Sequence, residues 1–437
     1  MSSSSRVLVA LAFHYWFFTS SIHATVGSEP VSLWNSSQEL TGPLPSGDAI
    51  SSGFGSKVAI WGRVAIIGAP ALSRGSTLES AGAAYVFLRR ATREPMGTGK
   101  WTSVATLVAP DAASYDFFGD QVAVSRDTAV VSATYKTGAG VGGALDQAGS
   151  VYVFSRTAEK AQLRNGGGNW TLNAVLDEPN PRSGNWFGIS VGVAGDTIVV
   201  GARQAGNGAG AAYIFRRNPL NNWSLDATLL PPNYPADKVQ FGWDVAVSRR
   251  GTAVLSAVSS NGSGTVFIFT YSNETNPPEW SMISRLLSPS PSSSGQSDYF
   301  GSSVSISGRH VVIGAPTNNT AYIFSRRRSS GTRRQWTLTA TLVAEDSVDG
   351  DFFGGSVSVV ARYAVVGAQF HKSFGAAYLF QLESSRPRWT LVAKLVQPEP
   401  AERYGFGSSV HLSRHAVLVG SETTVFSFPL NVSTMVQ

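Results

Sequence analysis

A Phe-Gly pair recurs seven times along nearly the whole chain, and similar phrases follow it each time. The pairs begin at Phe54, Phe118, Phe187, Phe241, Phe300, Phe353 and Phe406. Successive pairs lie 53 to 69 residues apart. A period of this length indicates a repeat architecture, in which each unit is one supersecondary motif that buries its apolar face against its neighbours.

Each period carries four strand-like phrases. In the fifth unit, residues 300–307 alternate between polar and apolar side chains, and residues 311–315 form a compact apolar run. An aromatic phrase, residues 321–324, and a phrase that opens on Trp336 follow. Alternation is typical of a strand with one buried face, and a continuous apolar run is typical of a strand buried on both faces. Seven such units without helical periodicity predict an all-β fold, a seven-bladed β-propeller of four-stranded antiparallel blades.

The ends of the chain predict how the ring closes. The seventh unit stops after its aromatic phrase, residues 425–428, and has no Trp phrase. A strand-like stretch at the other end, residues 31–34, has the character of the missing strand. We expect this N-terminal strand to complete the last blade, which removes the edges that an open array would expose. The propeller is therefore expected to span residues 31–430, with blades that start near the seven Phe positions.

The N-terminus has the features of a secretory signal. Arg6 precedes a 12-residue apolar run, residues 7–18, and small residues follow it. A run of this length is short for a membrane span, so we interpret residues 1–24 as a cleaved signal peptide, with an uncleaved anchor as the alternative. The chain has no cysteine, so its stability rests on burial and strand pairing. We expect a secreted or cell-surface-associated monomer without a transmembrane anchor.

Asn-x-Ser/Thr sequons fit export and predict N-glycosylation sites. They lie at Asn35, Asn169, Asn222, Asn261, Asn273, Asn318 and Asn431. In two of them, Asn169 and Asn222, the third position belongs to the repeated Trp phrase, so the repeat explains the match equally well.

The ordered phrases resemble the FG-GAP repeat family, which includes the head of integrin α subunits. The similarity is greater to the variant repeat of bacterial and protist secreted and surface proteins. The residues that carry it are the Phe-Gly pairs, Gly-Ala phrases such as residues 314–315, Ala-Ala-Tyr phrases such as residues 376–378, and the Trp phrases. The resemblance implies a β-propeller that binds an extracellular ligand through the loops on one face, as an adhesion or recognition module.

Integrin-type repeats often carry a calcium loop between the first two strands of a blade, and this chain departs from that pattern. Its turns there are short and rich in Arg, Gly and Ser, as in residues 248–251 and 307–309. They do not offer the several oxygen ligands that calcium takes. We therefore expect no metal and no cofactor.

Polar residues precede several Phe-Gly pairs, next to an aromatic residue. Asp116, Asn185, Asp298 and Asp351 stand two positions before the Phe, and Trp186 and Tyr299 are among the aromatic residues between. Together with Asp349 they are the candidate ligand-binding residues at one mouth of the central channel, because polar groups beside aromatic faces suit a carbohydrate or a peptide side chain. The alternative is that Asp and Asn cap the tight entry into the first strand. Glu345 and Asp346 extend the acidic stretch, which is either a cation site or a solvated loop.

Strand order also predicts a charge difference between the two faces. The top face, which comprises the turns between strands four and one and between strands two and three, is acidic. The bottom face, formed by the other turns, is basic, with runs such as Arg326-Arg327-Arg328. Such a face suits an anionic glycan, another cell-surface polymer or a lipid surface, and it also suits simple solubility. Since turns explain the net charge of +6, we do not expect a nucleic-acid partner.

No catalytic constellation is visible in the sequence. It contains neither Gly-x-Ser-x-Gly nor His-Glu-x-x-His. We expect a non-enzymatic binding module for a protein or cell-surface ligand. A carbohydrate-binding propeller lectin is the alternative, and a propeller hydrolase is a third interpretation because its site would be assembled from separate loops.

Overall fold

The computed structural model describes residues 37–42, 52–90, 99–140, 143–157, 168–232, 238–258, 263–275, 278–291, 297–328, 334–384, 388–398 and 405–430. The signal peptide predicted for residues 1–24 and the strand predicted for residues 31–34 lie outside these ranges, as do Asn35, Asn261 and Asn431. Within the described ranges, no helix is both long and apolar enough for a membrane span.

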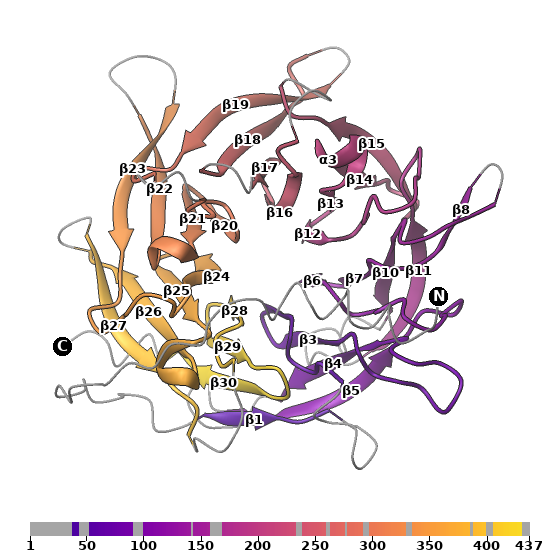
Figure 1. The fold of residues 1–437 in the computed structure, drawn as a ribbon, viewed down its shortest axis with the longest axis horizontal. Helices are drawn as coiled ribbons and strands as arrows, with labels where there is room; N and C mark the ends of the chain where they lie inside the picture. Colours follow the sequence, from indigo (N-terminus) through magenta and orange to yellow (C-terminus); the bar gives the residue numbers. More distant parts are fainter. Residues whose placement is uncertain are drawn as a thin grey trace. The chain divides into compact units, whose positions relative to one another are not determined.

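Residues 32–437 form one compact unit. Its four-stranded antiparallel sheets, seven in number, stand in a ring around a central axis (Figure 1). The fold is thus the predicted seven-bladed β-propeller. Beyond the blades, β8 (Gly138–Gly140) and β9 (Gly143–Leu145) form a small hairpin in the top face of blade 2. Short helical turns follow second strands at α3 (Ala205–Gly208), η1 (Pro316–Asn318) and η2 (His371–Ser373).

Each blade contributes one strand to each of four concentric positions. In the order of blades 1 to 7, the innermost strands are β2 (Val58–Trp61), β6 (Val122–Ser125), β12 (Ser190–Ala194), β16 (Phe241–Ser248), β20 (Val304–Ser307), β24 (Phe353–Val360) and β28 (Ser409–Leu412). In the same order, the second strands are β3 (Val64–Ala69), β7 (Thr128–Ala133), β13 (Thr197–Ala202), β17 (Thr252–Ala257), β21 (His310–Ala315), β25 (Tyr363–Ala368) and β29 (Ala416–Gly420). The third strands are β4 (Ala83–Arg89), β10 (Ser150–Thr157), β14 (Ala211–Arg217), β18 (Thr265–Ser272), β22 (Thr320–Arg328), β26 (Ala376–Leu382) and β30 (Val425–Pro429). The outer strands are β5 (Trp101–Leu107), β11 (Asn169–Leu176), β15 (Trp223–Leu229), β19 (Glu279–Leu287), β23 (Arg334–Leu342), β27 (Trp389–Leu395) and β1 (Gln38–Leu40).

An N-terminal strand closes the ring, as predicted. β1 pairs antiparallel with β30, with Gln38 opposite Ser427 and Leu40 opposite Val425. The pairing residues are 38–40, so the closing strand lies a few residues later in the chain than the predicted stretch. Gln38 also connects blade 7 to blade 1, because its side-chain amide exchanges two hydrogen bonds with the backbone of Trp101, at 2.8 and 3.1 Å.

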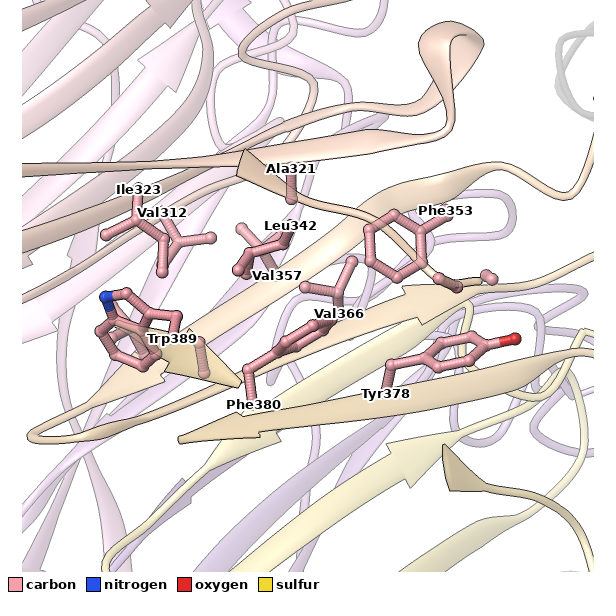
Figure 2. Packing of buried hydrophobic residues seen from close by; sticks show 14 of the residues in the cluster. Val312, Ala321, Ile323, Leu342, Phe353, Val357, Val366, Tyr378, Phe380 and Trp389 are labelled. Atoms are coloured by element: carbon pink, nitrogen blue, oxygen red, sulfur yellow. The ribbon is translucent and has the colours of Figure 1, made fainter. Parts of the chain in front are cut away.

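The Phe of each Phe-Gly pair anchors the core between two blades. All seven are fully buried. Phe353, for example, packs against Tyr378 and Phe380 of β26, with ring centroids 5.4 and 6.3 Å apart (Figure 2). The same contact with two aromatic residues of the third strand occurs in the other six blades. The repeated aromatic phrase is therefore explained by packing.

Serine side chains join neighbouring innermost strands. Ser305 and Ser307 of β20 accept hydrogen bonds from the backbone N–H groups of Val359 and Ala361, each at 3.1 Å. Ser303, Ser356, Ser358 and Ser409 accept equivalent bonds from the next blade around the ring. These N–H groups have no strand partner on the channel side, so the hydroxyl groups satisfy donors that would otherwise be unpaired near the axis.

The outer strands are irregular at one common position. In six blades the register shifts by one residue where the outer strand pairs with the third strand, as between Ile323 and Phe324. Such a bulge twists the strand and interrupts its free edge, which discourages pairing with a strand from another chain.

Candidate binding site on the top face

In blade 5 the acidic and basic turns lie on opposite faces, as predicted. In blade 5, Arg327 and Arg328 of β22 pair with the first residues of β23, whereas Ala321 at the other end of β22 pairs with Leu342 at the end of β23. The antiparallel register therefore places Asp349 and Asp351, which follow β23, on the face opposite the arginines. A structure with both groups on one face would have refuted the strand assignment.

The four candidate residues two positions before the Phe are buried and serve the loops. Asp116 and Asp351 each accept a hydrogen bond from the backbone N–H three residues earlier, at 2.8 and 2.9 Å. Asp298 accepts one from the N–H of Phe300, at 3.0 Å. Asn185 donates to Glu178 at 2.7 Å. Their exposed fractions are 5 % or less. The hydrogen bonds favour the capping interpretation for the three Asp residues, whereas Asn185 bonds another side chain.

In blade 6, side chains from a later turn and from two strands hold the loop that contains Asp351. Asp351 lies 2.8 Å from Nδ1 of His371, whose Nε2 lies 3.0 Å from the ammonium of Lys394. Lys394 in turn donates to Asp346 at 2.6 Å, and Tyr378 donates to the same carboxylate at 2.9 Å. Together, Lys394 and Tyr378 hold the pKa of Asp346 below its usual value against the effect of burial, which acts to raise it. The acidic stretch of blade 6 is therefore largely a structural network.

The remaining members of that stretch do not converge. Glu345 and Asp349 are exposed. Among the described residues, no three His, Asp or Glu side chains gather closely enough to hold a metal ion. The interpretation of the acidic stretch as a cation site thus has no geometric support in this part of the chain.

The aromatic candidates lie in a different environment. Trp186 and Tyr299 belong to what we term the aromatic arc, which runs along the top ends of the innermost and second strands of blades 2 to 5. Its members are Phe117, Tyr135, Trp186, Arg203, Trp243 and Tyr299. Successive ring centroids are 5.4 Å apart for Phe117 and Tyr135, 6.1 Å for Tyr135 and Trp186, and 6.4 Å for Trp243 and Tyr299.

Arg203 joins the two halves of the arc. Its guanidinium carbon lies 4.9 Å from the ring centroid of Trp186 and 4.2 Å from that of Trp243. Burial lowers the pKa of Arg203, while Tyr135 and Asp120 act in the opposite direction. The same burial raises the pKa of Tyr135 to about 12. A guanidinium held between two indoles is fixed in orientation, which reduces the entropy lost when it contacts a ligand.

The backbone at the arc carries a cost that the fold alone does not explain. The residue before each Phe lies in the left-handed region in all seven blades. Glycine fills this position in blades 1 and 7, as Gly53 and Gly405, whereas Phe117, Trp186, Tyr299 and Phe352 fill it in four others, with φ between 52° and 58°. For a bulky residue this conformation costs about 1–2 kcal/mol. Aromatic side chains therefore stand where glycine would be cheaper, which is typical of a functional site.

The structure adds Tyr135, Arg203 and Trp243 to the residues predicted from sequence. The signal that marks them is departure from the repeat. Arg203 replaces the Pro that ends the second strand phrase in blades 1 and 5, and Trp243 stands where the corresponding positions of blades 1, 5 and 7 have Ser. Of the predicted glycosylation sites, Asn169, Asn222 and Asn273 are exposed, whereas Asn318 is half-buried and its amide donates to the carbonyl of Ser290 at 3.0 Å.

Comparison with known families agrees with the fold. The family model described as the FG-GAP repeat matches residues 34–87, 101–154, 170–215, 280–324 and 336–380, more than half of the chain. The chain belongs to the FG-GAP repeat family. No match appears among the curated proteins. Among solved structures, a functionally unknown protein from Desulfotomaculum acetoxidans is similar, with a TM-score of 0.44 and 12 % identity over 78 % of this chain and 86 % of that one.

Proposed function

We propose that this FG-GAP repeat protein is an exported, non-enzymatic binding module that recognises an extracellular protein or cell-surface ligand through the aromatic arc. The observation that supports this most is the strained backbone at Trp186 and Tyr299, where the same fold accepts glycine in two other blades. Trp, Tyr and Arg are also the residue types that dominate binding energy at protein interfaces. The loops with buried Asp and His residues then act as the rigid support of this surface.

A carbohydrate ligand is the second candidate. Tyr299 and Phe352 are each 37 % exposed, so part of each ring is open to solvent, and aromatic faces stack well on sugar rings. A hydrolase gains little support, because the His371 network is buried and lies beneath the surface.

Substitution by glycine tests the proposal without disturbing the backbone. Tyr299→Gly and Trp186→Gly place at these positions the residue that blades 1 and 7 already use. Gln240→Gly is the matched control, since Gln240 has φ of 52° at the same position of blade 4 and is not aromatic. We expect Tyr299→Gly and Trp186→Gly to weaken binding to the ligand by about tenfold or more, and Gln240→Gly to leave it unchanged.

The ligand is first sought on a glycan array and on a panel of immobilised matrix proteins. Saturable binding to matrix proteins that Tyr299→Gly abolishes supports a protein ligand, and the same result on the glycan array supports the lectin. Binding that all three variants retain equally would place the ligand elsewhere on the molecule.

A further inference from the structure

A ring of arginines surrounds the bottom mouth of the central channel. The turns between strands one and two are the bottom loops nearest the axis, and six of the seven contain arginine. This arginine ring consists of Arg63, Arg126, Arg249, Arg250, Arg309, Arg362 and Arg414, and every one is exposed. The charge sits on the opposite face from the aromatic arc.

Turn chemistry does not account for these arginines. The first residue of most of these turns has positive φ, for example Gly62, Gly195 and Gly308. Short hairpin turns of this kind favour Gly, Asn and Asp. Blade 3 follows that preference with Gly195-Asp196, whereas blades 1 and 5 have Arg in the Asp position. Arg126 even occupies the left-handed position itself, with φ of 56°.

The acidic residues of the same turns pair with an arginine outside the ring. Asp127 and Asp196 are the carboxylates in these seven turns. Both pair with Arg217 of β14, at 3.8 and 2.7 Å. Within the described ranges, no carboxylate lies within 4.0 Å of any member of the arginine ring. In this part of the chain, the guanidinium groups of the ring therefore have no carboxylate partner.

Two further observations define this surface. The guanidinium of Arg249 in blade 4 lies 5.8 Å from the ring centroid of Trp61 in blade 1. These blades are not neighbours in the ring, so the contact reaches across the mouth and gathers the charge over the axis. Burial lowers the pKa of His415 beside the mouth, and the positive charges of Arg89, Arg414 and Arg63 lower it further.

We propose that the arginine ring binds an acidic polysaccharide, whose sulfate or carboxylate groups pair with guanidinium groups from successive blades. Guanidinium forms paired hydrogen bonds with such oxyanions. In six of the seven blades the turn offers one or two arginines, which suits a polymer that carries a charge on each unit. The choice of this polyanion rests on the proposed export of the chain, because acidic polysaccharides are abundant outside cells.

Other polyanions fit the surface less well. A lipid surface is bound strongly when apolar side chains enter it. The residues that flank these turns include two large aromatic side chains, Trp61, which already contacts Arg249, and the half-buried Tyr363. Single-stranded nucleic acid is bound through aromatic rings on which its bases stack, and these turns have few aromatic side chains for that purpose.

The test measures binding of fluorescein-labelled heparin dodecasaccharide by anisotropy over a range of NaCl concentrations. Arg126→Gln with Arg250→Gln is the test variant, and Arg182→Gln with Lys238→Gln, exposed on the top face, is the control with the same change in net charge. We expect the test variant to bind at least tenfold more weakly, with a shallower dependence on salt, and the control to bind like the unaltered protein.

Several outcomes would overturn the proposal. They are equal losses in the two variants, no heparin binding at 50 mM NaCl, and tighter binding to duplex DNA or to phosphatidylserine vesicles than to heparin. Tyr299→Gly is expected to retain heparin binding, so failure of the top-face proposal and failure of this one give different results.

Discussion

At the scale of single residues, glycine sets the distance between blades. A Cβ built on Gly314 of blade 5 would lie 1.9 Å from the carbonyl oxygen of Gly354 in blade 6. A Cβ built on the equivalent glycines Gly68, Gly201 and Gly367 would lie 2.0 to 2.1 Å from a carbonyl oxygen of the next blade. The Gly-Ala phrase of the repeat is thus explained by two backbones that meet without a side chain between them.

We predict that Gly314→Ala destabilises the protein by about 3 kcal/mol or more, because the new methyl group meets backbone that has little room to move. Gly192→Ala is the control, since its Cβ would meet its nearest atom at 3.5 Å, an ordinary contact distance. Urea unfolding followed by tryptophan fluorescence measures both. Equal midpoints for the two variants would show that the blades separate easily.

The roles of residues at the top face were the hardest feature to predict from the sequence. The sequence indicates the Asp residues before the Phe as candidate ligand-binding residues. In the structure, Asp116 and Asp351 instead contact Lys136 and His371, which come from turns 20 residues further along the chain. The contact of Arg203 with both Trp186 and Trp243 joins two blades. The repeat pattern describes what blades share, whereas these contacts depend on what single blades change.

At the scale of strands, the serine bonds between innermost strands replace ordinary sheet pairing around the channel. Ser358 is buried and accepts a hydrogen bond from the N–H of Leu412 at 3.0 Å. Ser302 lies near the start of an innermost strand, and its buried hydroxyl has no hydrogen-bond partner among the described residues. A comparison of alanine substitutions at Ser358 and Ser302 therefore separates the effect of losing the hydrogen bond from the effect of removing a hydroxyl group.

We predict that Ser358→Ala lowers the free energy of unfolding by about 1–3 kcal/mol, because a backbone N–H near the axis loses its acceptor. Ser302→Ala should be neutral or slightly stabilising. Chemical denaturation provides the free energies, and hydrogen exchange at Leu412 should rise in Ser358→Ala alone. Unchanged exchange there would mean that water replaces the hydroxyl.

Asp244 of β16 takes the place of serine in this series and adds a dependence on pH. It accepts a hydrogen bond from the N–H of Val304 at 2.7 Å. Burial raises its pKa to about 6 despite this bond, Lys57 and a second backbone N–H. Because the folded state binds the proton more tightly than the unfolded state, the contribution of Asp244 to stability is full below about pH 4. It is lost as the pH rises through 6.

Asp244→Ser should remove this dependence. We expect the free energy of unfolding of the unaltered protein, relative to Asp244→Ser, to fall by about 1–3 kcal/mol between pH 4.5 and pH 8. Urea titrations at several pH values give both curves, and their difference removes the titration of other groups. Parallel curves would contradict a raised pKa.

Strand positions were predictable because seven copies of one pattern carry the same information. Innermost strands start at the Phe only in β16 and β24 and a few residues later in the other blades, although the Gly after the Phe has positive φ in all seven. The bulge in the outer strands was not predicted from the sequence.

At the scale of the whole molecule, stability depends on a short strand that closes the ring. β1 has three residues, and Leu40 is its buried side chain, packed in the cluster that contains Phe54 and Val425. Trp101 of blade 1 completes the junction, since its indole N–H donates to Ser427 at 2.9 Å. The pairing of β1 with β30 joins residues that are far apart in the sequence, so its formation costs more loop entropy than any other strand pairing in the fold. We therefore expect this pairing to open before the pairings in the other blades.

We predict that Leu40→Ala destabilises the pairing of β1 with β30 by about 2–5 kcal/mol. We expect blade 7 to open locally in this variant while the other blades stay folded. Hydrogen exchange at the amides of Val425 and Ser427 in β30 should accelerate strongly, while exchange in β13 and β17 on the far side of the ring should change little. Leu172→Ala, on the exposed face of β11, is the control and should leave all these rates unchanged. If Leu40→Ala accelerates exchange equally in every blade, the ring unfolds as one cooperative unit, and the N-terminal strand then stabilises the propeller as a whole instead of one blade.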